Sequence, residues 1–217
     1  MNVTRIKPAC LMLLPFFLLS FDVSKSYASS SETIVLTKEI ISSLEKCPRK
    51  NTMELNCKSY HQTTNYTCGP AAVMTLMRYY GMLSAKDMNK TTELRIAHEM
   101  SATAGDGGGT TPSQVESWLA DHGFSVDSGQ NVSTDLLIAN VKKGIPTIMG
   151  ANRHWVLAKG YNKGSTPAED EVIFADSCCN VSVMSRDTID MMWAEAHMPS
   201  NHCSDNVGRF IVAIPQK

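Results

Sequence analysis

Residues 62–81 read QTTNYTCGPAAVMTLMRYYG, and this stretch decides the fold. Pro70 suits the first turn of a helix, where a missing N–H costs nothing. Only two of the ten residues from 71 to 80 are clearly polar, and a helix that is apolar nearly all round is a buried one. We therefore predict a central helix that begins near Cys68 and is ended by Gly81.

The predicted helix places a cysteine, Cys68, at or just before its N-terminus. The unpaired N–H groups and the positive end of the helix dipole stabilise a thiolate there, and a thiolate is a nucleophile near neutral pH. Gln62, six residues upstream, is the natural donor to an oxyanion, with its side-chain amide paired with the backbone N–H of Cys68. The alternative is that Cys68 is a structural thiol or a disulfide partner.

A thiolate nucleophile needs a base and a group that orients the base. His154 precedes an apolar run that is closed by Gly160, which predicts a strand starting at His154. The next strand is predicted over residues 171–176 and ends on Asp176, whose carboxylate can accept a hydrogen bond from the imidazole. Because the 162–170 loop can join the two strands as antiparallel neighbours, we expect the two side chains to meet.

Other residues compete for both roles. The rivals of Asp176 are Asn162, Asp170 and Asn180. The remaining histidines are less suited because of their positions: close to Gln62, in helical stretches, or in an irregular region; these are His61, His98, His122, His197 and His202. His154 is therefore the preferred base.

The motifs together resemble a known family. Gln-x5-Cys-Gly-Pro-Ala, a following Tyr-Tyr-Gly, Gly-x-Pro before His-Trp-Val-x3-Gly-Tyr, and then Asp are similar to the papain-like cysteine peptidases that process bacteriocin leaders at a double glycine, and especially to their free-standing relatives without a transporter. The resemblance runs from Tyr60 to the C-terminus. It implies an α+β, papain-like fold with the nucleophile helix in a helical half and an antiparallel sheet in the other half.

Carried over residue by residue, the resemblance implies four roles: Gln62 in the oxyanion hole, Cys68 as nucleophile, His154 as general base and acid, and Asp176 as the orienting residue. It implies a cysteine peptidase acting on a peptide or protein substrate, without cofactor or metal. Two alternatives stay open: a thiol-dependent transpeptidase or amidase resembling phytochelatin synthase, and a papain-like binding protein whose Cys68 is oxidised or idle.

The N-terminus predicts export. Arg5 and Lys7 precede an apolar run over residues 9–21, and Ser26-Tyr27-Ala28 offers small residues for cleavage. This pattern is typical of a secretory signal peptide, cleaved after Ala28. No second apolar stretch approaches spanning length, so we expect no membrane association after cleavage and a secreted or periplasmic protein.

The cysteines agree with an oxidising compartment. Residues 29–58 are predicted to form an N-terminal extension, with a helix around 37–45 and a disulfide loop between Cys47 and Cys57. Cys203 could pair with Cys178 or Cys179 in the catalytic domain, residues 59–217. The glycosylation sequon at Asn65 lies beside Cys68, where a glycan would obstruct the nucleophile, which favours a bacterial source.

Charge and local signals complete the prediction. With 20 Lys and Arg against 21 Asp and Glu, the chain has no basic excess for binding nucleic acid. Further helices are expected over 85–89, 92–100, 112–120, 133–143 and 187–196. Residues 144–149 are expected to begin the strand-rich half, and residues 210–214 to form the last strand. The glycine-rich residues 105–109 are expected to form a surface loop, with a rim over a peptide cleft as the functional alternative.

Overall fold

The structure is a computed structural model that describes residues 52–105, 108–130, 132–151, 153–196 and 207–216. All of them belong to one compact unit, Arg49–Lys217. The predicted signal peptide, most of the predicted extension, Cys47, Cys203, His197 and His202 lie outside the described residues. Within the described part of the chain, no helix is both long enough and apolar enough to cross a bilayer.

A seven-stranded sheet forms the centre of the unit, and all of its strand pairs are antiparallel. The strands follow the order β2-β7-β3-β4-β5-β6, and β1 pairs with the far end of β4. Their bounds are β1 Thr52–Glu54, β2 Phe124–Gly129, β3 Thr147–Ala151, β4 His154–Asn162, β5 Glu171–Asp176, β6 Asn180–Ser185 and β7 Phe210–Pro215.

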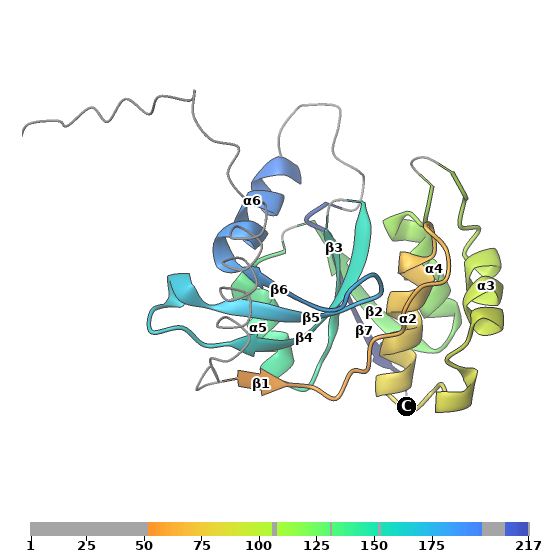
Figure 1. The fold of residues 1–217 in the computed structure, drawn as a ribbon, viewed down its shortest axis with the longest axis horizontal. Coiled ribbons are helices and arrows are strands. Elements are labelled where there is room, and N and C mark those ends of the chain that lie inside the picture. The colour runs from red at the N-terminus through yellow and green to blue at the C-terminus, as the bar shows by residue number, and fades with distance from the viewer. Residues whose placement is uncertain (1–51, 106–107, 131, 152, 197–206, 217) are drawn as a thin grey trace, which may run out of the picture. The chain divides into compact units, whose positions relative to one another are not determined.

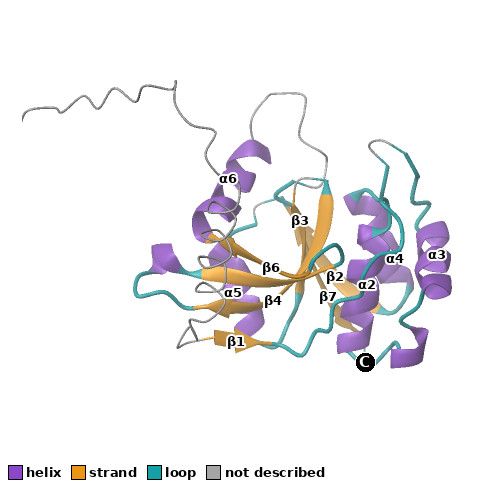
Figure 2. Cartoon of the chain, in the orientation of Figure 1, coloured by secondary structure: helices purple, strands orange, loops and turns teal. Residues whose placement is uncertain are grey.

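Helices cover both faces of the sheet. Figure 1 shows α2, α3 and α4 on one side and α5 and α6 on the other, and Figure 2 shows the same division by element type. The helices are α2 Cys68–Tyr79, α3 Lys90–Glu99, α4 Pro112–Asp121, α5 Thr134–Lys142 and α6 Arg186–Ala196, with short 3-10 turns at Ala85–Asp87 and Pro167–Glu169. The fold is therefore α+β, as the sequence predicts.

Strand β4 is apolar from Trp155 to Ala158 because this part of the strand lies in the core on both faces. Trp155 and Leu157 pack in the cluster that contains α2, whereas Val156 and Ala158 pack in the cluster that contains α5. Successive side chains of a strand point to opposite faces, so a strand covered on both sides needs an unbroken apolar run. His154 is thus the first residue of a strand that is fixed on both faces.

Three predicted helices, α2, α4 and α5, begin at local signals that the structure confirms, whereas the helix expected over 92–100 begins earlier, at Lys90. Every residue of α2 from Cys68 to Leu76 is buried, as expected for a central helix. Thr111 caps α4 in a capping box with Gln114, and Ser133 caps α5 by accepting from the N–H of Leu136. These helices begin where the sequence places their caps.

One strand end and three strands differ from the prediction. Gly160 does not end β4, which continues to Asn162. A Cβ at position 160 would lie 2.7 Å from the carbonyl oxygen of Met53, so the glycine admits β1 alongside β4 rather than closing the strand. Strands β1, β2 and β6 were not expected. Since β1 pairs with β4, and Cys57 is buried in the α2 cluster, the chain from Thr52 onward packs with the rest of the unit.

Candidate active site

Cys68 is the first residue of α2, at the N-terminus of the central helix. Its residue is buried, with 6% exposure, and its thiol is free. The first intrahelical bond runs from Ala71 N–H to Thr67 carbonyl oxygen, and Pro70 has no N–H to offer. The N–H groups of Cys68 and Gly69 therefore remain as the donors of the first turn, beside the sulfur.

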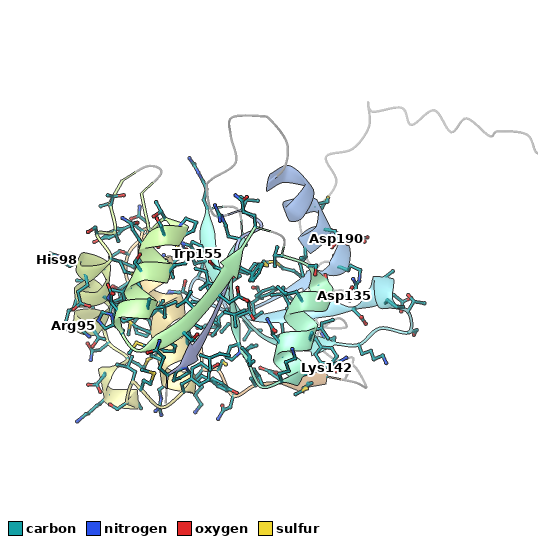
Figure 3. All side chains as sticks on the ribbon, turned by 180° about the vertical axis from the view of Figure 1, so that it is seen from behind. Arg95, His98, Asp135, Lys142, Trp155 and Asp190 are labelled. Carbon is teal, nitrogen blue, oxygen red and sulfur yellow. The ribbon has the colours of Figure 1, made fainter. Side chains whose placement is uncertain are left out.

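Gly69 lets the tip of α2 approach the sheet closely. A Cβ at this position would lie 2.1 Å from Thr110 Oγ1 and 3.3 Å from Trp155 Cδ1. Trp155 follows His154 in β4, and its indole N–H donates to the carbonyl oxygen of Thr110 at 3.1 Å. Figure 3 shows Trp155 beside the helices that cover this face. The glycine of the Cys-Gly-Pro motif thus sets the spacing between the helix that carries Cys68 and the strand that carries His154.

The register of β4 and β5 brings His154 and Asp176 together. Asp176 lies opposite Val156, and His154 stands two positions before Val156, so both side chains emerge on the same face as diagonal neighbours. His154 Nε2 lies 2.9 Å from Asp176 Oδ1. Because a carboxylate only accepts, Nε2 carries the proton, and Nδ1 is left for the thiol of Cys68.

The electrostatics of the pair favour an imidazolium. Burial alone would lower the pKa of His154, but hydrogen bonds with Cys68 and Asp176, together with their charges, raise that pKa to about 9. Burial would raise the pKa of Asp176; the hydrogen bond from His154, a second one from the N–H of Cys178 at 2.8 Å and the charge of His154 instead bring that pKa below its usual value. At neutral pH the carboxylate is therefore ionised and the histidine is protonated.

Gln62 is held by Ser177, the residue after Asp176, and has an oriented amide. Its backbone N–H donates to the Ser177 carbonyl oxygen at 3.0 Å, and its Oε1 accepts from the Ser177 hydroxyl at 2.6 Å. Its Nε2 donates to the carbonyl oxygen of Thr64 at 2.6 Å, which settles which end of the amide is nitrogen. One N–H of Nε2 is used in this bond, so the other can serve a ligand.

Two of the three rivals of Asp176 make contacts elsewhere, whereas the third, Asn180, stands opposite Asp176 in the pairing of β5 with β6. Asp170 accepts from the N–H of Gly164 and faces Arg186, and Asn162 bonds with Thr52 and Glu171. His122 stacks on Trp118, with ring centroids 3.7 Å apart, and its Nδ1 lies 2.7 Å from the Trp118 carbonyl oxygen. His61 and His98 are exposed. Among the described candidates, His154 and Asp176 are the histidine and carboxylate that meet.

The other described cysteines are also free thiols: Cys57 is buried, whereas Cys178 and Cys179 are exposed. The predicted bridges to Cys47 and Cys203 involve residues outside the described part of the chain and stay predictions. Among the described residues, no group of three His, Cys, Asp or Glu side chains is placed to hold a metal ion.

Comparison with known proteins gives a family match and a set of similar folds. Residues 54–198 match the model of a family described as the Peptidase_C39 like family. No curated protein matches the chain significantly.

Two solved structures share the fold at low sequence identity. One, described as a C39-like peptidase from Bacillus anthracis, has a TM-score of 0.52 and 12% identity and covers 77% of this chain and 100% of its own. The other, described as a double glycine motif protease from an AMS/PCAT transporter in complex with the leader peptide, has a TM-score of 0.50 and 14% identity, covering 75% and 94%. The predicted papain-like peptidase fold is thereby confirmed.

Proposed function

The chain belongs to the Peptidase_C39 like family, and from this premise we propose that it is an exported cysteine peptidase that hydrolyses peptide amide bonds through Cys68, His154, Asp176 and Gln62. The family match supports a cysteine peptidase. The observation that carries the assignment of residues is the single hydrogen-bonded chain in which His154 contacts Cys68 on one side and Asp176 on the other.

Acylation of the enzyme uses each of these groups once. The Cys68 thiolate attacks the carbonyl carbon of the scissile amide, and the negative charge that develops on the carbonyl oxygen is held by the backbone N–H of Cys68 and the free N–H of Gln62. The protonated His154 then gives its Nδ1 proton to the leaving amine as the C–N bond breaks. Asp176 keeps the imidazole oriented and favours its charged form.

Deacylation reverses these roles. Neutral His154 takes a proton from water, the hydroxide attacks the thioester carbonyl, and the sulfur leaves as a thiolate. An amine in place of water gives a transpeptidation product by the same steps. When water accepts the acyl group, the reaction is the hydrolysis of a peptide bond.

A peptide substrate is supported by a solved structure of the same fold that contains a bound peptide. One structure with the same fold is described as a complex of a double glycine motif protease with a leader peptide. We propose that this chain likewise takes an extended peptide across the tip of α2, where the oxyanion donors lie.

The test is hydrolysis of a mixed peptide library by the wild-type protein and by Cys68→Ala and His154→Ala variants, with products identified by mass spectrometry. We expect cleavage by the wild type and at least about a 10⁴-fold loss in Cys68→Ala, because removing the nucleophile of a catalytic unit leaves only binding and oxyanion stabilisation. Cleavage that persists in Cys68→Ala would contradict the proposal.

A matched control is Cys178→Ala, which removes an exposed thiol two residues after Asp176. It should keep full activity, since the contact that Cys178 makes with Asp176 comes from its backbone N–H. Adding glycine amide to the reaction separates the two reaction types: products extended by glycine amide, and absent without it, would favour the transpeptidase alternative.

A further inference from the structure

The carboxylate of Glu93 lies outside the four proposed catalytic residues, and its residue is completely buried. Glu93 stands in the first turn of α3, after the N-cap residue Asn89. Among the described residues, none forms an ion pair with it. A buried carboxylate in such a place is costly unless hydrogen bonds satisfy it.

Four donors satisfy the Glu93 carboxylate, two on each oxygen. Oε1 accepts from the N–H of Thr63 at 2.9 Å and from the Thr67 hydroxyl, and Oε2 accepts from the hydroxyls of Thr63 at 2.7 Å and Tyr60 at 3.0 Å. Three of the four come from the segment that joins Gln62 to Cys68. In Figure 1 this segment runs between α2 and α3 before it enters α2.

The hydrogen bonds continue from Glu93 to the amide of Gln62. The Thr67 hydroxyl gives its proton to Glu93, so the Thr64 hydroxyl, 2.7 Å away, donates to Thr67. The carbonyl oxygen of Thr64 accepts from Gln62 Nε2 at 2.6 Å. The orientation of the Gln62 amide is thus connected through Thr64 and Thr67 to the buried carboxylate of Glu93 on α3.

Thr67 does not cap α2 with its side chain, although it is at the N-cap position. It is the N-cap residue of α2, yet its side chain accepts no bond from the first turn of the helix. The N3 residue is Pro70, which has no N–H, and the Thr67 hydroxyl goes to Glu93 instead. The N-terminus of the nucleophile helix is therefore anchored from α3, and the N–H groups of its first turn stay available.

We infer that Glu93 is a positioning residue that holds Gln62 and the first turn of α2 in the relative geometry of an oxyanion hole. The inference rests on the proposed function. Glu93 touches neither Cys68 nor the space of the reacting atoms; it acts through Thr63 and Thr67. Donors to an oxyanion are effective only when neighbouring groups fix them to within a fraction of an ångström.

The test compares a reaction that develops an oxyanion with one that does not. With p-nitrophenyl acetate, Cys68 forms a thioester and releases p-nitrophenolate in a burst, whereas alkylation by iodoacetamide displaces iodide without an oxyanion. In Thr67→Val, an isosteric change, we expect the burst rate to fall about tenfold or more while the alkylation rate changes less than about twofold. Tyr79→Phe, which removes one hydrogen bond to Gly144 at the far end of α2, should change neither rate.

A double-mutant cycle shows whether Thr67 acts through Gln62. In a Gln62→Ala background, Thr67→Val should lower the burst rate no further. Glu93→Gln should keep more of the burst than Glu93→Ala, because its amide oxygen still accepts from Thr63 N–H while its NH₂ group faces two hydroxyls that can accept.

The outcomes separate the inference from the function on which it rests. A Thr67→Val variant that loses burst and alkylation in parallel, or loses the burst equally with and without Gln62, would show a general structural role and overturn the inference. A wild-type protein with neither burst nor rapid alkylation of Cys68 would remove the proposed function and this inference with it.

Discussion

The charge of His154 decides how the site responds to pH. Hydrogen bonds and charges from Cys68 and Asp176 outweigh burial and raise the pKa of His154 to about 9, so the imidazolium persists through neutral pH. A raised pKa of this kind contributes stability that is fully present below the unfolded value of about 6.5 and is lost as pH rises through about 9. In the proposed mechanism, this proton is the one that the leaving amine receives.

We therefore expect kcat/KM to fall as pH rises through about 9, because His154 loses the proton that it donates during acylation. In Asp176→Asn the descending limb should move to lower pH, since the variant removes a charge that raises the pKa of His154. The rate should also fall about 10²-fold, as expected when a reacting group is misplaced. A pH–rate profile measures both effects.

Asp135→Asn is the control for this prediction. Asp135 is exposed and pairs with Arg186 at 2.8 Å, away from His154. A descending limb that stays in place in Asp176→Asn, or that moves equally in Asp135→Asn, would show that the Asp176 charge does not set the pKa of His154.

Gly69 is the second position where a single residue governs the site. In Gly69→Ala the new methyl group would meet the side chains of Thr110 and Trp155. We expect overpacking to lower the free energy of unfolding by about 1–3 kcal/mol and to displace Cys68 from His154. Urea denaturation and peptide hydrolysis together measure the two effects.

The double variant Gly69→Ala with Thr110→Ala checks the cause. It removes Thr110 Oγ1, the atom that would lie nearest to the new methyl group and a buried hydroxyl without a hydrogen-bond partner in the described structure. Stability should be partly restored. If the double variant is no more stable than Gly69→Ala alone, the close approach of Thr110 is not the reason for the glycine.

At the scale of elements, the attachment of β1 to β4 depends on a buried cation. Lys159, with 8% side-chain exposure, pairs with Glu54 at 2.6 Å, and the N–H of Leu55 donates to the Lys159 carbonyl oxygen. Glu54→Gln leaves a buried ammonium without its counter-charge, so we expect a loss of about 1–3 kcal/mol in the free energy of unfolding, at the lower end because Glu54 is 45% exposed.

Lys159→Met is the matched variant, because methionine keeps an unbranched apolar stem and removes the charge that needs a partner. It should cost less than Glu54→Gln in urea denaturation at an unchanged m-value. A larger loss in Lys159→Met would mean that the ion pair itself, rather than the unpaired ammonium, dominates the attachment.

Elements with local signals could be predicted from the sequence, and elements defined by pairing could not. The starts of α2, α4 and α5 are marked in the sequence by a first-turn proline, Pro70, and by the N-cap residues Thr111 and Ser133. Strand β1 is three residues long and exists only because β4 pairs with it. In β6 the two valines, Val181 and Val183, face the solvent at the edge of the sheet, with 51% and 49% exposure, and not the core. The apolar residues of β6 therefore do not mark a buried face.

The site divides in the same manner. Cys68, His154 and Asp176 stand at predicted element ends, so the prediction of two adjacent strands was enough to expect the His154–Asp176 contact that the structure contains. Glu93 gave no such signal. It lies in an ordinary polar helix, and only the packing of α3 against the segment before α2 turns it into a buried acceptor of four hydrogen bonds.

At the scale of the whole molecule, the cysteines connect folding with the proposed export. Cys57 is 2% exposed, and burial raises its pKa to about 12, although Lys159 opposes that rise. A buried thiol with a high pKa has little thiolate and reacts slowly in the folded state. A bridge from Cys57 to Cys47 would therefore have to form before the core closes around Cys57.

We expect cysteine labelling of the protein recovered from the culture medium or periplasm to follow this order. At pH 6, iodoacetamide should modify Cys68 first, because Cys68 is the thiol that contacts the protonated His154 at the N-terminus of a helix. If one of Cys178 and Cys179 is bridged to Cys203, only the other should react with iodoacetamide. Cys57 should react only after denaturation, when a second, isotopically distinct label is added and its site is identified by peptide mapping. The same maps show whether the recovered chain begins at Ser29, as the predicted signal peptide requires. Recovery of Cys57 bridged to Cys47 would mean that oxidation precedes folding, whereas labelling of Cys57 in the native protein would contradict the packing of β1 and Cys57 against the core.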